Sequence, residues 1–437
     1  MDTLFKNARI MTVTPTVKIR EGDLLVSGNR IKQIAKRIER KDPSNTTVID
    51  CGGNLLMPGF KNGHAHSAMC FARSCSDGYR LWDWLNRIIF PMEARLEPGD
   101  IRELSKLSFL EYLTTGITSV FDMYLDPEEQ AQAAKDLGMR SVVLIQPAGY
   151  PERYPEYESR YLNGHMHDGL VTYQLGFHAE YTTKYDDLVK TAKLAHKYRL
   201  PVYTHSNETL RDVDSCIDRN RSMRPVEYLD GVGIFDHGGA IFHGVHLSEN
   251  EQYILRDRKV SIVTNPGSNS KLSSGIAHIL YYMEKGINIG LGTDGPGSNN
   301  ALDFFREMYL ATVLQKIQTG DPTALDALTV LQMATCNTAR LMRLEEADDL
   351  KVGKLADIIM LDLHRPSMRP FNDIARNVVY SGSKDLVKMT MIDGRILYMD
   401  GEFRIDEDPE EIYAKAQRIT DRIRVPAPKR TKRTRRS

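Results

Sequence analysis

Eight short apolar, β-branched runs recur along the middle of the chain, and segments with helical periodicity separate most of them. The runs span residues 55–60, 118–121, 141–145, 171–177, 202–204, 240–242, 260–263 and 288–291. Apolar residues spaced for one face predict helices over 100–112, 187–198 and 302–317. Strands that alternate with helices form parallel sheets, and eight strands close a barrel. The pattern predicts an α/β fold with a (β/α)8 TIM-like barrel.

The two ends of the chain have a different pattern of apolar and polar residues. Roughly the first 55 residues alternate short apolar and polar runs with glycines between them, and this pattern returns over residues 353–394. We expect both ends to build one small composite β-sandwich. The predicted division is 1–57 for the N-terminal part of the sandwich, 58–348 for the barrel, 349–405 for the C-terminal part of the sandwich, and 406–437 for a C-terminal helix and a basic disordered tail.

The composition is that of an ordinary soluble globular protein. Of 437 residues, 41% are hydrophobic and 27% are charged, and the formal net charge is zero. The whole molecule therefore has no electrostatic preference for nucleic acid or membrane. Five cysteines without a Cys-x-x-Cys pair suggest reduced thiols, and no apolar run approaches the ~18 residues of a membrane span. We expect a cytoplasmic protein with no membrane partner and no signal peptide.

The last nine residues break this neutrality. Residues 429–437 contain six lysines or arginines and no acid, and two prolines stand just before them. Such a segment is typical of a disordered tail. It could contact nucleic acid or an anionic surface, but the favoured interpretation is a solvated terminus without a specific partner.

Polar side chains follow the predicted strands where each strand ends. His64 and His66 follow the first strand, and His178 follows the fourth. The fifth, sixth and eighth strands are followed by His205, His243 and Asp294. In a barrel these ends meet at one mouth, where catalytic residues lie.

Four of these residues have the chemistry of a metal site. His64 and His66 are two apart and share one face of a strand. His205 would give a third nitrogen and Asp294 an oxygen, a set that suits one divalent ion, with zinc favoured and ferrous iron as the alternative. A lone histidine is more often a structural residue, but four residues in register favour a catalytic metal that lowers the pKa of water.

Two further residues could handle protons and charge. Glu208 stands three residues after His205 and could carry a proton between water and substrate. Its alternative roles are to cap a helix or to support the site from outside. His243 could hydrogen-bond the attacking hydroxide and stabilise the tetrahedral intermediate.

Five segments together resemble the amidohydrolase superfamily, and most of all its methylthioadenosine/S-adenosylhomocysteine deaminases and triazine-type aminohydrolases. They are Pro58-Gly59-Phe60-Lys61-Asn62-Gly63-His64-Ala65-His66, Thr204-His205-Ser206-Asn207-Glu208-Thr209, His243-Gly244-Val245-His246-Leu247, Asn265-Pro266-Gly267-Ser268-Asn269 and Gly292-Thr293-Asp294-Gly295-Pro296-Gly297-Ser298-Asn299-Asn300. The resemblance covers nearly the whole chain except the tail.

The resemblance implies a one-metal enzyme that adds water to an amino-substituted heteroaromatic ring and releases ammonia. The implied substrate is an adenosine-type nucleoside: methylthioadenosine, S-adenosylhomocysteine, 5'-deoxyadenosine or adenosine. By the same resemblance Glu208 protonates the ring, His243 orients the hydroxide, and Asp294 binds metal and handles a proton. Glu93 matches a ribose-contacting position and His178 a substrate-contacting histidine. A homo-oligomer is also implied.

The sequence departs from the family near the predicted pocket. Glu180 replaces the usual proline after His178-Ala179, and it could contact substrate or face solvent. Arg153 and Arg160 are candidates to hold a substrate carboxylate, although Gln146 stands where an arginine is expected.

Trp82 could stack on a base, although packing within its own short helix is the commoner explanation for the pair that it forms with Trp84.

Two rival functions stay open. The nearer rival is a sibling amidohydrolase that acts on guanine, a triazine or another C–N or C–Cl bond. The other is a non-catalytic binding protein on the same scaffold, against which the intact ligand set and Glu208 argue.

Overall fold

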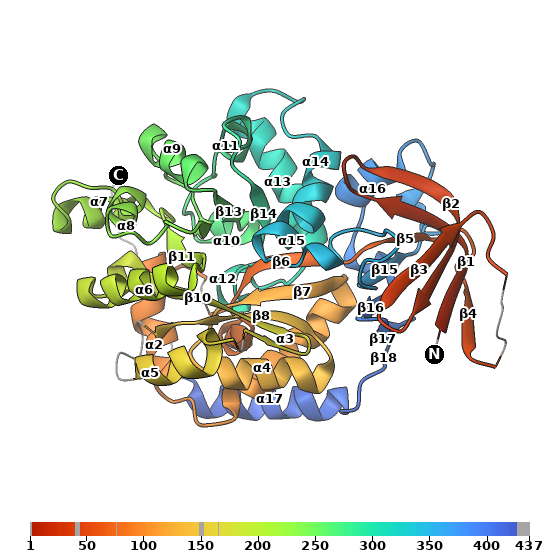
Figure 1. The fold of residues 1–437 in the computed structure, drawn as a ribbon, viewed down its shortest axis with the longest axis horizontal. Helices are drawn as coiled ribbons and strands as arrows, with labels where there is room; N and C mark the ends of the chain where they lie inside the picture. Colours follow the sequence, from red (N-terminus) through yellow and green to blue (C-terminus); the bar gives the residue numbers. More distant parts are fainter. Residues whose placement is uncertain (1, 40–43, 76, 148–152, 165, 426–437) are drawn as a thin grey trace, which may run out of the picture.

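The computed structural model describes residues 2–39, 44–75, 77–147, 153–164 and 166–425. Two sheets organise this part of the chain, and they stand side by side in Figure 1. One is the centre of a barrel surrounded by helices, and the other gathers strands from both ends of the chain.

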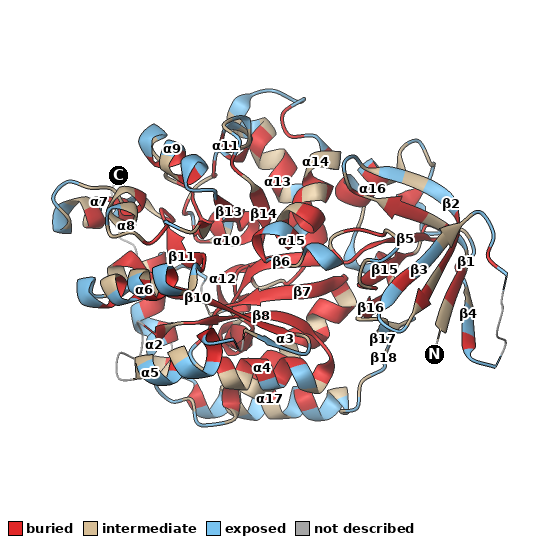
Figure 2. Cartoon of the chain, in the orientation of Figure 1, coloured by how far each residue is buried: buried red, intermediate tan, exposed pale blue. Residues whose placement is uncertain are grey.

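The barrel sheet has eight parallel strands in the order in which they follow along the chain. These are β6 (Phe60–Ala65), β7 (Ile117–Asp122), β8 (Arg140–Ile145), β10 (Val171–Ala179), β11 (Val202–Ser206), β12 (Gly239–His243), β13 (Val260–Thr264) and β14 (Ile289–Leu291). A short strand, β9 (His167–Asp168), pairs antiparallel with β10. The strands are buried nearly throughout, as Figure 2 shows. The predicted (β/α)8 barrel is confirmed.

The first and last strands meet just beyond the end of β14. The backbone N–H of Asp294 donates to the carbonyl of His64 at 3.0 Å. The backbone N–H of Thr293 donates to the side chain of Asn62 at 2.9 Å, and the Asn62 amide donates back to the Thr293 hydroxyl at 2.7 Å. These contacts fix the relative positions of two predicted metal ligands, His64 and Asp294.

The prediction for the first barrel strand was wrong. Residues 55–58 form β5 (Leu55–Pro58), which belongs to the other sheet, and the barrel strand begins at Phe60. The barrel strand escaped detection because it contains polar residues that are nevertheless fully buried. Lys61, for example, is buried and donates from Nζ to the Thr118 hydroxyl at 2.8 Å and to the Gly59 carbonyl at 3.1 Å, so its polar group is hydrogen-bonded within the fold.

Helices cover the outside of the barrel. The longer ones are α3 (Asp100–Thr115), α4 (Pro127–Leu137), α6 (Tyr185–Tyr198), α7 (Leu210–Arg219), α9 (Glu249–Asp257) and α13 (Phe304–Thr319). The shorter ones are α8 (Pro225–Gly231), α10 (Pro266–Lys271), α11 (Ile279–Glu284), α14 (Ala327–Gln332), α15 (Thr338–Leu341) and α16 (Ile374–Tyr380). Local signals set their limits: the Asp126 side chain caps the first turn of α4, and Gly138 ends that helix in a left-handed conformation.

Short helical segments lie in the loops near the carboxyl ends of the strands. Among them are a 3-10 helix over Ser67–Ala72, α1 (Leu81–Trp84), α2 (Phe90–Glu93), α5 (Tyr154–Tyr157) and α12 (Pro296–Asn299). The C-terminal helix α17 (Pro409–Ile423) packs against α3, and its Ala416 and Ile423 share an apolar core with Leu81, Trp84 and Leu85. Helix α17 thus packs against the segment of α1, which lies near the carboxyl ends of the barrel strands.

The second sheet is built from both ends of the chain, as expected. Its strands are β1 (Asp2–Thr12), β2 (Lys18–Ser27), β3 (Arg30–Ala35), β4 (Thr46–Asp50), β5, β15 (Ile358–Leu361), β16 (Val387–Ile392), β17 (Arg395–Met399) and β18 (Glu402–Phe403). Most neighbours run antiparallel, and the junction between the two chain ends is the antiparallel pair β5–β15. Side chains such as Phe5, Leu24 and Ile358 give this sheet a core of its own.

The predicted basic tail, residues 429–437, lies outside the described residues. None of the helices in the described part of the chain combines the length and apolar character needed to cross a membrane.

Candidate active site

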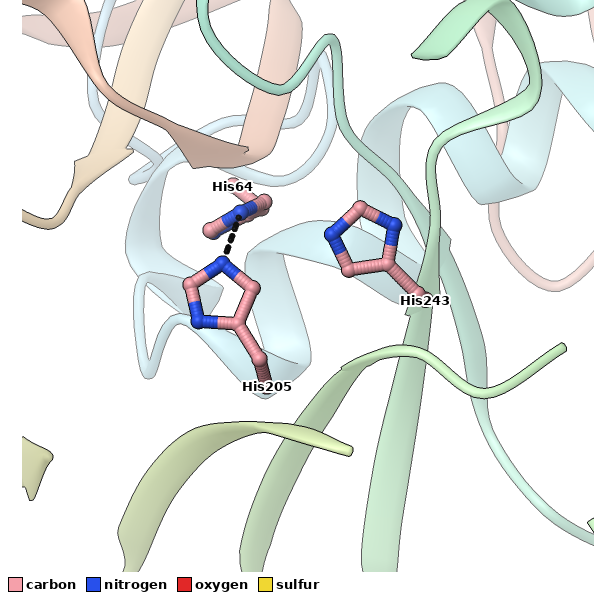
Figure 3. Close-up of side chains that lie close together, drawn as sticks. All are labelled: His64, His205 and His243. Atoms are coloured by element: carbon pink, nitrogen blue, oxygen red, sulfur yellow. Dashed lines mark hydrogen bonds between the residues drawn. The ribbon is translucent and has the colours of Figure 1, made fainter. Parts of the chain in front are cut away.

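Five of the predicted polar residues meet at the carboxyl end of the barrel. His64 is in β6, and His66 directly follows that strand. His205 is in β11, His243 is the last residue of β12, and Asp294 lies three residues beyond β14. Figure 3 shows His64, His205 and His243 pointing toward one another from their separate strands. All but His66 are buried. The barrel thus brings the predicted cluster together at the ends of its strands.

The ligand atoms of four of these residues face one another at short range. Nε2 of His205 lies 3.1 Å from Nε2 of His64 and 3.3 Å from Nε2 of His66. Oδ1 of Asp294 lies 3.5 Å and 3.4 Å from the same two nitrogens. One carboxylate oxygen and three imidazole nitrogens therefore surround a single point.

The opposite nitrogens of two rings are anchored. Nδ1 of His66 donates to the Met123 carbonyl at 2.7 Å, and Nδ1 of His205 donates to the His178 carbonyl at 2.7 Å. The proton therefore sits on Nδ1, and Nε2 presents a lone pair to the cluster. Burial lowers the pKa of His64 to about 3 and that of His205 well below its ordinary value, so these rings are neutral at pH 7.

The donor set fits one divalent cation. Lone pairs that face one another at 3.1–3.5 Å repel unless a cation lies between them. A metal about 2.05 Å from each of four ligand atoms in tetrahedral geometry places those atoms roughly 3.3 Å apart, which matches the observed separations. Two trios among the described residues could hold a metal ion: His64, His66 and Asp294, and His64, His205 and His243. Nδ1 of His243 is bonded to the Asn269 side chain at 2.8 Å, so only its Nε2 could serve as a ligand.

Asp294 is held by hydroxyl groups from two loops. Its Oδ2 accepts hydrogen bonds from Ser268 at 2.6 Å and Ser298 at 2.7 Å, while Oδ1 accepts from the Gly295 N–H at 2.8 Å. Burial opposes its negative charge, but the hydrogen bond with His64 and the neighbouring imidazoles keep the pKa well below its usual range. Asp294 and His243 both have a positive φ, +59° and +74°, a strained conformation that clusters at functional sites.

Glu208 lies beside this cluster in the loop after β11. Its Oε2 is 3.8 Å from Nε2 of His243, and the side chain is buried. Burial, together with the charges of Asp212 and Asp294, raises the pKa of Glu208 well above its usual range. This shift favours the protonated carboxyl group, which is the state that a general acid requires.

A pocket of about 380 Å³ opens from this cluster. Met69, Leu81, Trp84, Leu85, Ile89 and Met123 give it an apolar wall, and Glu93, Gln146, His178 and Thr182 add polar groups. Burial raises the pKa of Glu93 to about 7 and lowers that of His178 to about 4. The predicted substrate-contacting residues Glu93 and His178 thus line the same pocket as Glu208.

Three other predicted substrate residues do not line this pocket. Trp82 points away, donates from Nε1 to Asp212 at 2.9 Å and packs on the Tyr181 ring at 4.7 Å between ring centres. Arg153 is bonded to Glu156 at 3.0 Å, and Arg160 pairs with Glu128. These acids hold the three side chains outside the cavity.

The open question about Glu180 has an answer in the structure. The Glu180 side chain accepts hydrogen bonds from Arg219 at 2.8 Å and from Asn220 at 2.7 Å, and it is 8% exposed. It therefore lies neither among the lining residues of the pocket nor free in solvent. The departure from the usual proline serves packing between the loop after β10 and helix α7.

Trp84, which with Trp82 was a possible base-stacking residue, lines the pocket, and its Nε1 is buried without a hydrogen-bond partner in the described structure. Several other residues of the site were not foreseen. Tyr124 lines the pocket beside Glu93. Ser268, Ser298 and Asn269 hold the predicted ligand Asp294 and the predicted His243. These three stand inside the segments that carried the family resemblance, but only the folded arrangement shows what they touch.

Comparisons with known proteins agree with this arrangement. A model described as "Amidohydrolase family" matches residues 55–397. The chain is 38% identical to a 5'-deoxyadenosine deaminase of Methanothermobacter thermautotrophicus, over 89% of this chain and 92% of the relative. It is 35% identical to a 5-methylthioadenosine/S-adenosylhomocysteine deaminase of Thermococcus kodakarensis, over 91% of this chain and 94% of the relative.

Solved structures have the same fold. A zinc-bound adenosine deaminase from Xanthomonas campestris superimposes with a TM-score of 0.87 at 28% identity, covering 97% of this chain and 98% of that one. The atrazine chlorohydrolase of Arthrobacter aurescens, at 23% identity and a TM-score of 0.86, covers 96% of this chain and 100% of that one and shares the fold. The family model and the relatives confirm the resemblance seen in the sequence: the chain belongs to the amidohydrolase family.

Proposed function

We propose that this protein is a metal-dependent hydrolytic deaminase of an adenosine-type nucleoside. The observation that carries the proposal is the placement of a buried carboxyl group, Glu208, in a pocket beside the cluster of candidate metal ligands. The relatives named as nucleoside deaminases support the substrate class. Hydrolytic deamination needs both parts, because water must be activated while the ring accepts a proton.

His64, His66, His205 and Asp294 would hold one divalent ion, for which zinc is our first choice and ferrous iron the second. Imidazole and carboxylate ligands suit both ions, and the structural relative with bound zinc favours the first. When bound, the metal would act as a Lewis acid that lowers the pKa of water.

Glu208 would act as the general acid. The raised pKa of its buried carboxyl group favours the protonated form, and the side chain lines the pocket where a ring nitrogen could lie. As water adds to the ring carbon that bears the amine, Glu208 donates its proton to the adjacent ring nitrogen. This transfer lets the ring accept the electron pair that the addition displaces.

Asp294 and His243 would manage the attacking water. Asp294 is anionic, so it can accept a proton from water and return it to the amine, which then leaves as ammonia. The hydrogen bond from Nδ1 of His243 to Asn269 leaves Nε2 as an acceptor that can orient the water beside Glu208. As the carbonyl forms, the hydroxyl proton of the adduct returns to Glu208, so the net change replaces the amine by oxygen and consumes one water.

The pocket would hold the nucleoside by its base and its sugar. The apolar wall that includes Trp84 and Ile89 suits the faces of a heteroaromatic ring. Glu93 and His178 supply polar contacts for hydroxyl groups and ring nitrogens. Tyr124 lies in the same wall beside Glu93.

The proposal is tested by ammonia release from zinc-loaded protein given adenosine, 5'-deoxyadenosine, methylthioadenosine, guanine, cytosine or a triazine. We expect release from the adenosine group and none from Glu208→Gln with the same metal content. Release from guanine or the triazine alone would assign a sibling activity. No release from any compound by metal-loaded wild type would overturn the proposal.

A further inference from the structure

The entrance of the pocket is apolar. Phe90 and Leu125 line the pocket and are 41% and 38% exposed, so they mark the place where it meets solvent. Leu85 and Ile89 continue this surface inward. Large apolar side chains are seldom left exposed together without a role in binding, and here they form the rim of the proposed active site.

The described pocket wall contains acidic side chains but no lysine or arginine. The acids are Asp294, Glu93 and Glu208. Residues 148–152, which lie outside the described part of the chain, have the sequence Ala-Gly-Tyr-Pro-Glu and also contain no cation. A substrate carboxylate would therefore enter without a basic side chain of the pocket wall to pair with it.

Arg153 and Arg160, which follow residues 148–152 in the sequence, are paired with acids outside the pocket. Arg153 makes two hydrogen bonds to Glu156, at 3.0 and 3.3 Å. Arg160 pairs with Glu128 and lies 3.5 Å from Glu156. Each arginine is paired with an acid, Glu156 or Glu128 of helix α4, so the two arginines add no unpaired positive charge near the rim.

We infer that the pocket selects nucleosides whose 5' end is neutral and apolar, and that it discriminates against an amino-acid end such as that of S-adenosylhomocysteine. The inference rests on the proposed function and narrows its substrate class. The apolar rim of Phe90 and Leu125 contacts a 5'-methyl or 5'-alkylthio group. A carboxylate at the same place loses water and gains no cationic partner.

The test compares kcat/KM of zinc-loaded, full-length protein for 5'-deoxyadenosine, methylthioadenosine, S-adenosylhomocysteine and an uncharged 5'-butylthioadenosine. Because the full chain is used, any contribution from the basic tail is included. We expect S-adenosylhomocysteine to be at least about 100-fold poorer than methylthioadenosine. The butylthio compound separates charge from length and should stay within about tenfold of methylthioadenosine.

A cation placed at the rim should increase activity toward S-adenosylhomocysteine. Leu125→Arg places a cation at the exposed rim, and Leu125→Gln is the matched uncharged control. We expect the arginine variant to raise kcat/KM for S-adenosylhomocysteine about tenfold over the glutamine variant, which corresponds to about 1.4 kcal/mol. The change should appear mainly in KM, because the reacting ring keeps its position.

The possible results of these measurements separate the inferred selectivity from the proposed function. Equal use of S-adenosylhomocysteine and methylthioadenosine by the wild type would overturn it while leaving the deaminase intact. Rejection of the butylthio compound would replace charge by length as the cause, and no gain from Leu125→Arg over Leu125→Gln would likewise overturn the charge argument. Inactivity toward all four nucleosides would instead refute the proposed function.

Discussion

Arg140 and Asp357 form a bidentate ion pair between the barrel and the sheet built from the chain ends. Nε and Nη2 of Arg140 donate to the two carboxylate oxygens of Asp357 at 2.7 and 2.9 Å. Both side chains are buried, and Nη2 also bonds Asp393 at 3.0 Å. Arg140 opens β8 and Asp357 immediately precedes β15, so the pair links the two sheets at a position where neither charge can reach water.

Removal of one partner should destabilise the protein strongly. Asp357→Asn leaves the Arg140 guanidinium buried without its main counter-charge, and we expect a loss of about 3–5 kcal/mol in the free energy of unfolding. Asp393→Asn is the control, because Asp393 is more exposed and gives Arg140 a single bond. Chemical denaturation measures both, and equal losses would contradict the importance assigned to the buried pair.

The same pair should make stability depend on pH in acid. Burial opposes the charge of Asp357, but Arg140 and Lys61 hold its pKa below the usual value. A carboxyl group with a lowered folded-state pKa stabilises the protein above its unfolded pKa of about 4, and that contribution is lost as pH falls further. The stability difference between wild type and Asp357→Asn should therefore shrink below about pH 4. A difference that stays constant down to pH 3 would exclude this linkage.

Glu208→Gln should abolish turnover without loss of metal. Glutamine cannot donate the proton that the ring needs, and general acid catalysis contributes about 10²- to 10⁴-fold to rate. We expect kcat to fall by that factor while zinc content and melting temperature stay close to wild type. Glu180→Gln is a matched control, since Glu180 is also a buried acid but lies outside the pocket. Similar activity losses in both variants would indicate a structural effect.

Much of the fold could be predicted because most barrel strands are short, apolar and bounded by helices. The exception is β6, where Lys61 and Asn62 are buried polar residues whose partners come from β7 and from the loop after β14. Those partners are 57 and 231 residues away, so no local pattern reveals them. The apolar run before Phe60 was easier to detect but belongs to the other sheet.

The candidate site could be predicted from the sequence for a similar reason. His64, His66, His205, His243 and Asp294 follow strands, and a barrel gathers strand ends at one mouth. Arg153, Arg160 and Trp82 lie in loops, whose course depends on neighbours such as Glu156 and Asp212 that sequence does not pair with them.

Other expectations from the sequence remain predictions. They are the domain limits, a homo-oligomeric assembly, a cytoplasmic location and the role of the basic tail.

Ser268 and Ser298 should strengthen metal binding through Asp294. Both hydroxyls donate to Oδ2 of Asp294, which fixes the carboxylate with Oδ1 toward His64 and His66. Loss of such a supporting hydrogen bond weakens metal affinity about 10- to 100-fold, so we expect this effect from Ser268→Ala and from Ser298→Ala.

Competition with a chelator measures the zinc Kd of these variants. Ser270→Ala, in the same helix as Ser268 but exposed, is the control. Unchanged zinc affinity in both single variants and in the double variant would show that Asp294 needs no such support.

Glu93 should make substrate affinity depend on pH near neutrality. Burial raises the pKa of Glu93 to about 7, so the group changes from neutral to ionised as pH rises through that value. A carboxylate accepts stronger hydrogen bonds from sugar hydroxyls than a carboxylic acid does, so KM should fall from pH 6 to pH 8. In Glu93→Gln this step should be absent, while changes due to other groups persist. The raised pKa also means that wild type loses stability relative to Glu93→Gln as pH rises from about 4.5 to 7, which thermal unfolding can follow. Parallel KM profiles for the two proteins would rule out a role of Glu93 in binding the sugar.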